Sequence, residues 1–322
     1  MPQIGPYQAL VRIVTCGFCN GTDTRIIFEQ MTRQQGLQPY PTLLGHEAAG
    51  VVEVLGAKVR HIHIGEKHIH ITGVATPPYS STHAQMAQYG VLTDTQAMFE
   101  DGLIEQSAVH PLAKLPADFD LTDAGVLLPL CECLSAVRNF GIDDTTDVLI
   151  YGAGPMGLAM MRYMHILGAK SVTAIDSVPE RLEMALRIGR VNRVINYETE
   201  VVDDVLAGQL FDRVVDAVGL SSIIYEGSRR CKPYGMVCAL GVLRAEDSVV
   251  DLSLLKNNSR LHMLNFPYQE YNVLDENIGY IQQGLIDPKD FHSHVMPMED
   301  VEQALQLVLN KQTIKVILKM HE

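Results

Sequence analysis

The sequence predicts an α/β protein in which a β-rich N-terminal part precedes a doubly wound parallel sheet. Residues 1–115 contain short alternating apolar runs separated by glycine and proline, a pattern typical of strands and turns. From about residue 120, short apolar segments alternate with longer amphipathic ones. This alternation predicts right-handed strand–helix–strand units around a parallel sheet.

Composition narrows the class of protein. The 322 residues favour two domains, and 47% hydrophobic with 20% charged residues is an ordinary globular composition. The net charge of −13 argues against nucleic acid and anionic membrane surfaces as partners. No apolar run approaches the roughly 18 residues of a membrane span, and no signal peptide is visible. Six cysteines are too few for a disulfide scaffold, so we expect a cytoplasmic protein with reduced thiols.

The individual elements follow from the apolar pattern. Short apolar runs bounded by turn residues predict strands, and longer amphipathic stretches predict helices. The expected strands are 9–14, 48–55, 147–151, 171–176, 211–217, 235–240 and 313–319, and the expected helices are 155–167, 179–188, 221–231 and 298–310.

A glycine-rich turn follows the strand expected at 147–151. Its residues have the G-x-G-x-x-G spacing of a dinucleotide-binding turn between a strand and a helix: Gly152, Ala153, Gly154, Pro155, Met156 and Gly157. Gly152 permits the tight turn, Gly154 lets the backbone approach a pyrophosphate, and Gly157 lets the helix pack closely. Pro155 suits the first helical turn, whose free N–H groups then face the phosphates.

An acidic residue stands where such a turn needs one. Asp176 ends the next expected strand, where a carboxylate accepts hydrogen bonds from the ribose hydroxyls and repels a 2′-phosphate. Residues 177–179 contain no arginine for that phosphate, so NAD is favoured over NADP. Arg181 is placed to stack near the adenine, and Val218 completes the candidate cofactor-binding residues. The alternative is a strand–turn–helix unit that binds no nucleotide.

A metal signal lies in the N-terminal part. Cys16 and Cys19 are followed by Gly45, His46 and Glu47. Thiolate, imidazole and carboxylate are the ligands that zinc prefers, and three protein ligands leave a fourth position for water or substrate. The alternative is that the cysteines are small buried side chains and His46 a loop histidine.

Together, these motifs and their order resemble the zinc-dependent medium-chain dehydrogenase/reductase family of alcohol, polyol and threonine dehydrogenases. The resemblance extends through Gly65-Glu66-Lys67 to the last helix and strand. It implies a GroES-like β-barrel catalytic domain at 1–118, an NAD-binding Rossmann domain at 119–285, and a return to the first domain at 286–322. It also implies an active site between the domains, a homodimer or homotetramer, and a first domain that is N-terminally short by about two dozen residues.

The resemblance places the catalytic zinc on Cys19, His46 and Glu47, with Glu47 either a ligand or a neighbour of the ligands. Thr22 would pass on the substrate's proton. Zinc would act as a Lewis acid on the substrate oxygen, and NAD would accept the hydride. The implied function is oxidation of a secondary alcohol, polyol or sugar-like substrate.

Several residues depart from the family pattern. Asn20 is an extra residue between Cys19 and Thr22, and Arg25 stands where a relay histidine is common. Leu128 replaces a glutamate, which makes Glu132, one helical turn later, a candidate for the same role or only a polar residue near the nicotinamide. The four-cysteine structural zinc lobe is absent, so one zinc per chain is expected.

Two further questions stay open from the sequence. His61, His63, His68 and His70 alternate with isoleucine around Gly65. A hairpin would place these histidines on one face that could bind a transition metal, and the alternative is a solvated strand face. Two other functions also remain: a zinc-free quinone or enoyl reductase of the same family, and a non-catalytic dinucleotide-binding protein.

Overall fold

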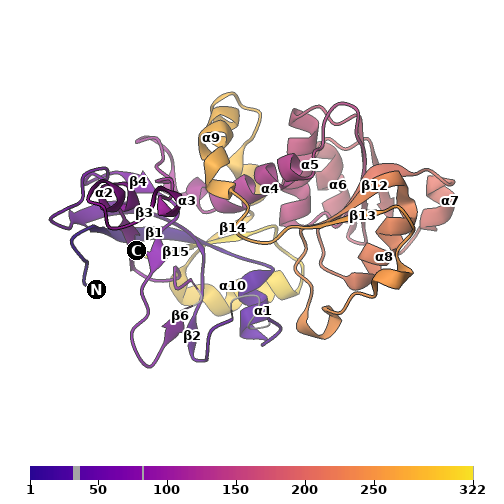
Figure 1. The fold of residues 1–322 in the computed structure, drawn as a ribbon. Coiled ribbons are helices and arrows are strands. Elements are labelled where there is room, and N and C mark those ends of the chain that lie inside the picture. Colours follow the sequence, from indigo (N-terminus) through magenta and orange to yellow (C-terminus); the bar gives the residue numbers. More distant parts are fainter. Residues whose placement is uncertain (32–36, 82, 322) are drawn as a thin grey trace. The chain divides into compact units, whose positions relative to one another are not determined.

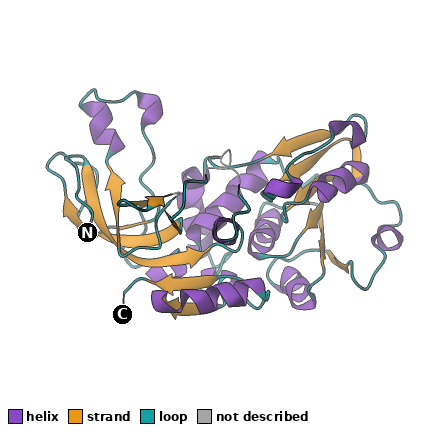
Figure 2. Ribbon diagram, turned by 90° about the horizontal axis from the view of Figure 1, so that it is seen from below, coloured by secondary structure: helices purple, strands orange, loops and turns teal. Residues whose placement is uncertain are grey.

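The computed structural model describes residues 1–31, 37–81 and 83–321. The chain forms two compact units, residues 1–129 together with 287–322, and residues 130–286. Both chain ends belong to the first unit (Figure 1), and Figure 2 distinguishes the helices and strands of each unit. Among the described residues, no helix is long and apolar enough to span a membrane.

The first unit contains a mainly antiparallel sheet. Among the described residues it has seven strands, in the order β14-β15-β1-β3-β4, with β7 beside β1 and β5 beside β7. These strands are β1 (Gln8–Phe18), β3 (Glu47–Leu55), β4 (Lys67–His68), β5 (Thr72–Gly73), β7 (Tyr89–Thr93), β14 (His294–Pro297) and β15 (Val316–Lys319), and a separate pair joins β2 (Thr42–Leu43) to β6 (Ser80–Ser81). The helices are α1 (Thr22–Ile27), α2 (Thr95–Glu100), α3 (Leu121–Ala124) and α10 (Val301–Leu309).

Strand β1 organises this unit by pairing antiparallel with β3, β7 and β15. Its side chains Ala9, Val11 and Ile13 are fully buried in the core. The register places Gly17 of β1 opposite Glu47, the first residue of β3. The turn after β1 therefore lies beside the beginning of β3.

The second unit is built on a parallel sheet. Its strand order is β10-β9-β8-β11-β12-β13, and every pairing is parallel. The strands are β8 (Asp147–Tyr151), β9 (Ser171–Asp176), β10 (Arg193–Asn196), β11 (Phe211–Asp216), β12 (Cys231–Ala239) and β13 (Arg260–Met263). The helices are α4 (Leu127–Asn139), α5 (Pro155–Ile166), α6 (Pro179–Arg187), α7 (Val202–Leu206), α8 (Ser221–Arg230) and α9 (Leu274–Gln282). This confirms the expected doubly wound sheet, since the strand order reverses between β8 and β11.

Short 3-10 helices complete the connections, at Gln106–Ala108, Ala245–Asp247, Leu252–Leu254, Glu270–Val273, Pro288–Phe291 and Met298–Asp300. The expected helix at 298–310 therefore begins as a 3-10 turn, and α10 starts only at Val301. The pattern gave no indication of β10, β13, α7 or α9. Both strands, β10 and β13, have only four residues, too few to show a clear alternation.

The first unit extends further along the chain than residue 118. Helix α3 packs against β1 and β3, and Thr15 of β1 donates a 2.5 Å hydrogen bond to the carbonyl of Leu121. The Cβ position of Gly125 would also lie 2.8 Å from the side chain of Ile317 in β15. The change of sequence texture near 118 therefore does not coincide with the boundary at 129.

The four histidines around Gly65 form neither a shared hairpin face nor a solvated strand face. His68 is fully buried in β4, while the side chains of His61 and His63 are 38% and 70% exposed on the loop before it. Gly65 turns the chain with a φ of 85°, and His70 has a φ of 58°. These left-handed residues end the strand alternation, so the four imidazoles do not share one face.

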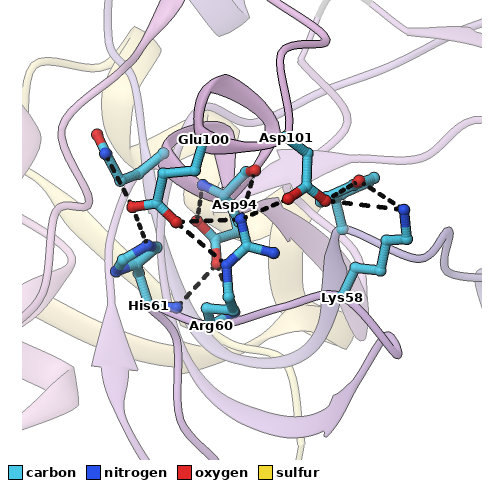
Figure 3. A network of polar contacts seen from close by, with 9 residues as sticks. Lys58, Arg60, His61, Asp94, Glu100 and Asp101 are labelled. Atoms are coloured by element: carbon cyan, nitrogen blue, oxygen red, sulfur yellow. Dashed lines mark hydrogen bonds and ion pairs between the residues drawn. The ribbon is translucent and has the colours of Figure 1, made fainter.

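A carboxylate network replaces that hairpin. Asp94 caps α2 by accepting a 2.9 Å hydrogen bond from the amide of Ala97, and it also accepts from the amides of Arg60 and His61 at 2.7 and 2.8 Å. The Arg60 and His61 side chains both reach Glu100, each at 3.0 Å (Figure 3). The loop before β4 is thereby attached to α2.

Glu66 stabilises the first unit near neutral pH but not at low pH. Burial alone would raise its pKa, but hydrogen bonds from Lys114, the amide of His63 and His68 lower the pKa to about 2. Because the folded pKa lies below the ordinary value of 4.5, its stabilisation is present above that pH and is lost as pH falls toward 2. We expect the loss to be about 1–2 kcal/mol after allowance for solvent screening.

The measurement is urea unfolding of the wild type and of Glu66→Gln between pH 5 and pH 2.5. The wild type should lose its advantage over the variant as pH falls, whereas replacing the exposed Glu105 by glutamine should leave the pH profile unchanged. A constant difference between wild type and Glu66→Gln would contradict the assignment.

Candidate functional site

Three potential metal ligands come together at one end of β1 and β3. Cys19 follows β1 directly, His46 precedes β3, and Glu47 begins it. Their ligand atoms lie within 4.8 Å of one another, and no other group of this kind occurs among residues 1–31, 37–81 and 83–321. The antiparallel pairing of β1 with β3 thus unites residues that are far apart in the sequence.

A glycine turn sets the direction of His46. Gly45 has a φ of 89°, and a Cβ there would lie only 2.5 Å from the amide nitrogen of Met86. The amides of Gln85 and Met86 donate to the carbonyls of Gly45 and Leu44 at 3.0 and 2.9 Å. The turn before His46 is therefore held by a second segment of the chain, and only glycine fits at its centre.

Asp23 connects the two ligand-bearing turns. This fully buried carboxylate accepts hydrogen bonds from the amides of Cys19 at 2.9 Å and Gly45 at 3.2 Å. Its Oδ1 also lies 3.7 Å from Nδ1 of His46. Burial is the main cause of the raised pKa of Asp23. Sequence analysis missed this residue, although an aspartate soon after Cys19 could have suggested it.

Lys315 forms a buried ion pair with Glu47. Its Nζ lies 2.6 Å from Oε1 of Glu47 and also contacts Oε2. The two side chains are 3% and 2% exposed. Lys315 directly precedes β15, whose pairing with β1 brings it beside Glu47. Sequence analysis missed this residue, because no motif marks a single lysine 268 positions away.

Two imidazoles lie side by side at this site. The rings of His46 and His83 have centroids 5.3 Å apart at a tilt of 51°. Burial would lower the pKa of His46, but the neighbouring Cys19, Asp23 and Glu47 outweigh it and raise the pKa to about 10. Burial, and then the charge of His46, lowers the pKa of His83 to about 4. Sequence analysis did not single out His83.

The residues at this site fit a zinc ion. Sulfur, nitrogen and carboxylate oxygen are its usual donors. Nδ1 of His46 is buried without a hydrogen-bond partner, and it faces Asp23. A zinc-bound histidine commonly uses one ring nitrogen for the metal and offers the other to a carboxylate, which is the arrangement available here. Thr22 begins α1, and its amide donates to the Cys19 sulfur at 3.3 Å.

The glycine-rich turn of the second unit has the geometry that its spacing predicts. Gly152 has a φ of 96°, and a Cβ on Gly157 would lie 1.9 Å from the carbonyl oxygen of Gly152. The nearest atom to a Cβ on Gly154 would be a guanidinium nitrogen of Arg181, 3.9 Å away. Pro155 is the first residue of α5. The backbone is therefore tightly packed between Gly152 and Gly157, whereas there is open space beside Gly154.

Asp176 and Val218 border this turn. The carboxylate of Asp176 accepts hydrogen bonds from the amides of Ala153, Ser177 and Val178 at 2.7–2.9 Å. A carboxylate has about four acceptor positions, so part of its capacity remains for a ligand. Val218 lies 2.8 Å from the Cβ position of Gly152.

Asp216 holds the loop that carries Val218. It is fully buried, and its carboxylate accepts from the amides of Val218 and Gly219 at 2.8 and 2.9 Å. Sequence analysis missed this residue, although an aspartate at the end of a buried strand was a usable signal.

Glu132 belongs to the second unit, on α4. Burial, and next the charge of Glu132, raises the pKa of Tyr271 well above its ordinary value. The neighbouring Cys131 and Cys133 are fully buried, and the Cys133 thiol donates to the carbonyl of Met156 at 3.3 Å. The metal-side role of Glu132 stays a prediction.

Comparisons with known families assign both units. Residues 5–115 match the alcohol dehydrogenase GroES-like domain, and residues 155–277 match the zinc-binding dehydrogenase family. The chain belongs to the zinc-binding medium-chain alcohol dehydrogenase family. The Cys19, His46 and Glu47 group is therefore the candidate zinc site of a family member.

Relatives of this family member cover its whole length. An alcohol dehydrogenase of Cupriavidus necator is 28% identical over 100% of this chain and 94% of its own. L-idonate 5-dehydrogenase of Vitis vinifera is 26% identical over 95% and 86%. A crystal structure from Escherichia coli CFT073, described as a short chain alcohol dehydrogenase with NADH, has a TM-score of 0.77 at 21% identity over 99% and 94%. The last likeness supports the fold alone.

Proposed function

We propose that the protein is an NAD-dependent zinc dehydrogenase that acts on a secondary alcohol, most suitably a polyol or sugar-like one. The observation that carries this proposal is the convergence of Cys19, His46 and Glu47 within 4.8 Å in one unit. A glycine-rich turn with a following acidic residue supports a dinucleotide site in the other unit. The relationship to L-idonate 5-dehydrogenase supports a polyhydroxylated substrate.

In this proposal, the residues of the first unit hold and orient the metal. Bound zinc supplies a Lewis acid that makes a substrate hydroxyl easier to deprotonate. Cys19 and His46 bind it, while Asp23 orients His46 through Nδ1. Lys315 fixes the carboxylate of Glu47, which favours a place for Glu47 beside the ligands, because both oxygens already contact the ammonium group. Thr22 is the candidate for moving the substrate's proton.

The second unit supplies the nucleotide site of this proposal. Bound NAD supplies the hydride acceptor. Gly154 and the first turn of α5 would hold the pyrophosphate, and Asp176 would use its remaining acceptor position for a ribose hydroxyl. Arg181 would border the adenine of the cofactor, and Val218, beside Gly152, is a further candidate contact.

Elemental analysis of tag-free protein tests the metal part of this proposal, and a screen of polyols with NAD and NADP tests the reaction. We expect one zinc per chain and oxidation with NAD. Protein without zinc, active on enones or quinones, would instead establish a zinc-free reductase. Nucleotide binding without turnover of any substrate would establish a non-catalytic protein.

Asp176→Ala should weaken NAD binding and reduce the preference for NAD over NADP. The loss of one charge-assisted hydrogen bond to the ribose predicts an increase in the KM for NAD on the order of tenfold. Removal of the negative charge removes its repulsion of a 2′-phosphate. Steady-state kinetics with both cofactors measure the change, with Glu180→Ala on α6 as the control. An unaltered preference would mean that Asp176 serves only the turn.

A further inference from the structure

His83 is an imidazole beside the candidate zinc site that the proposed reaction leaves without a role. Its ring centroid lies 5.3 Å from that of His46. It is not part of the group whose ligand atoms lie within 4.8 Å of one another. The ring therefore lies next to the metal-binding residues without being one of them.

The backbone fixes this position. The amide of Gly73 donates to the carbonyl of His83 at 3.2 Å, and a Cβ on Gly73 would lie 2.3 Å from that oxygen. Ala84 is fully buried, and the side chain of Gln85 accepts a 2.9 Å hydrogen bond from the amide of Ala48 while donating to the carbonyl of Ile71. The segment that carries His83 is thus attached to β3 and to the turn before His46.

None of these bonds uses the imidazole of His83. The residue is partly exposed, whereas Ala84 and Gln85 after it are buried. A neutral imidazole presents one hydrogen-bond donor and one acceptor. A partly exposed group of this kind, held against a metal-binding histidine, is placed to contact a molecule that binds at the metal.

We propose that His83 is a specificity-determining residue that hydrogen-bonds a second hydroxyl of the substrate, adjacent to the hydroxyl that is oxidised. In a vicinal diol the two carbons that carry the hydroxyl groups are bonded directly to each other. One hydroxyl oxygen at the metal therefore places the other within reach of a neighbouring imidazole. The contact is a hydrogen bond and transfers no proton. This inference rests on the proposed function, and it specifies the substrate class as vicinal diols and polyols.

The test compares 2,3-butanediol with 2-butanol, which differ by one hydroxyl. The variants are His83→Ala, His83→Gln, which keeps a donor and an acceptor, and the control His63→Ala, whose ring is exposed and contacts Glu66. Loss of one neutral hydrogen bond should raise the KM for the diol about 2- to 10-fold in His83→Ala. The values for 2-butanol should stay unchanged, and His83→Gln should recover part of the loss.

A second measurement does not require turnover. Titration of the cobalt-substituted protein with each alcohol, followed by visible absorption, should show diol binding that weakens about 2- to 10-fold in His83→Ala. Diol binding that depends on His83 without any turnover would reject the proposed dehydrogenase function and keep the role of His83. Equal losses for both alcohols, no loss for either, no diol binding by the wild type, or loss of metal in His83→Ala would each overturn the role of His83.

Discussion

Replacing Cys19 by alanine should remove the bound zinc and lower kcat on the order of 10³-fold. The sulfur is one of the two ligand atoms that the proposal assigns to the metal, and a site left with His46 as its ligand retains a divalent ion poorly. Loss of the metal removes several kcal/mol of charge stabilisation in the transition state. Elemental analysis and steady-state kinetics measure the two effects, while the affinity for NAD should remain nearly constant because the nucleotide turn belongs to the other unit.

Cys16→Ala is the matched control for this prediction. Cys16 lies three residues earlier and is fully buried in β1, but it is not part of the ligand group. Its replacement removes one buried sulfur and should cost about 1 kcal/mol of stability. Zinc content and kcat should stay close to the wild type. Full zinc content and activity in Cys19→Ala would contradict the zinc mechanism.

Replacing Lys315 by methionine should destabilise the metal-free protein by about 3–5 kcal/mol. Methionine keeps much of the length of the side chain but removes the closest counter-charge of the Glu47 carboxylate, which is 2% exposed. The imidazole of His46 remains, with its Nε2 3.8 Å from Oε1 of Glu47. Removing one partner of a buried ion pair is among the most destabilising single changes in a protein. Urea unfolding of the metal-free protein measures the loss, and addition of zinc should reverse part of it by neutralising Glu47.

Two comparisons make the Lys315 result specific. Arg12→Met breaks a surface pair with Glu53, whose partners are 35% and 36% exposed, and should cost less than about 1 kcal/mol. The double variant Lys315→Met/Glu47→Met replaces both charges with apolar groups and should regain most of the stability. A loss for Lys315→Met as small as that for Arg12→Met would show that the pair is not desolvated.

Most strands and helices of the second unit could be predicted from the local sequence. The strands expected at 147–151 and 171–176 have these bounds in the structure, because each is a short apolar run ended by a turn residue. The turn at Gly152 and Gly157 was equally clear, since backbone sterics alone demand glycine there. The short strands β10 and β13 were missed because they are ordered by their neighbours in the sheet more than by their own pattern.

For the candidate metal site, the sequence predicts the ligands but not the residues around them. The sequence by itself determined Cys19, His46 and Glu47, since ligand chemistry depends on residue type and a short local motif. Only the tertiary structure decided which groups surround them: Asp23 between the two turns, His83 beside His46, and Lys315 against Glu47. These groups act through burial and distance, and β-sheet pairing sets both between segments that lie far apart in the chain.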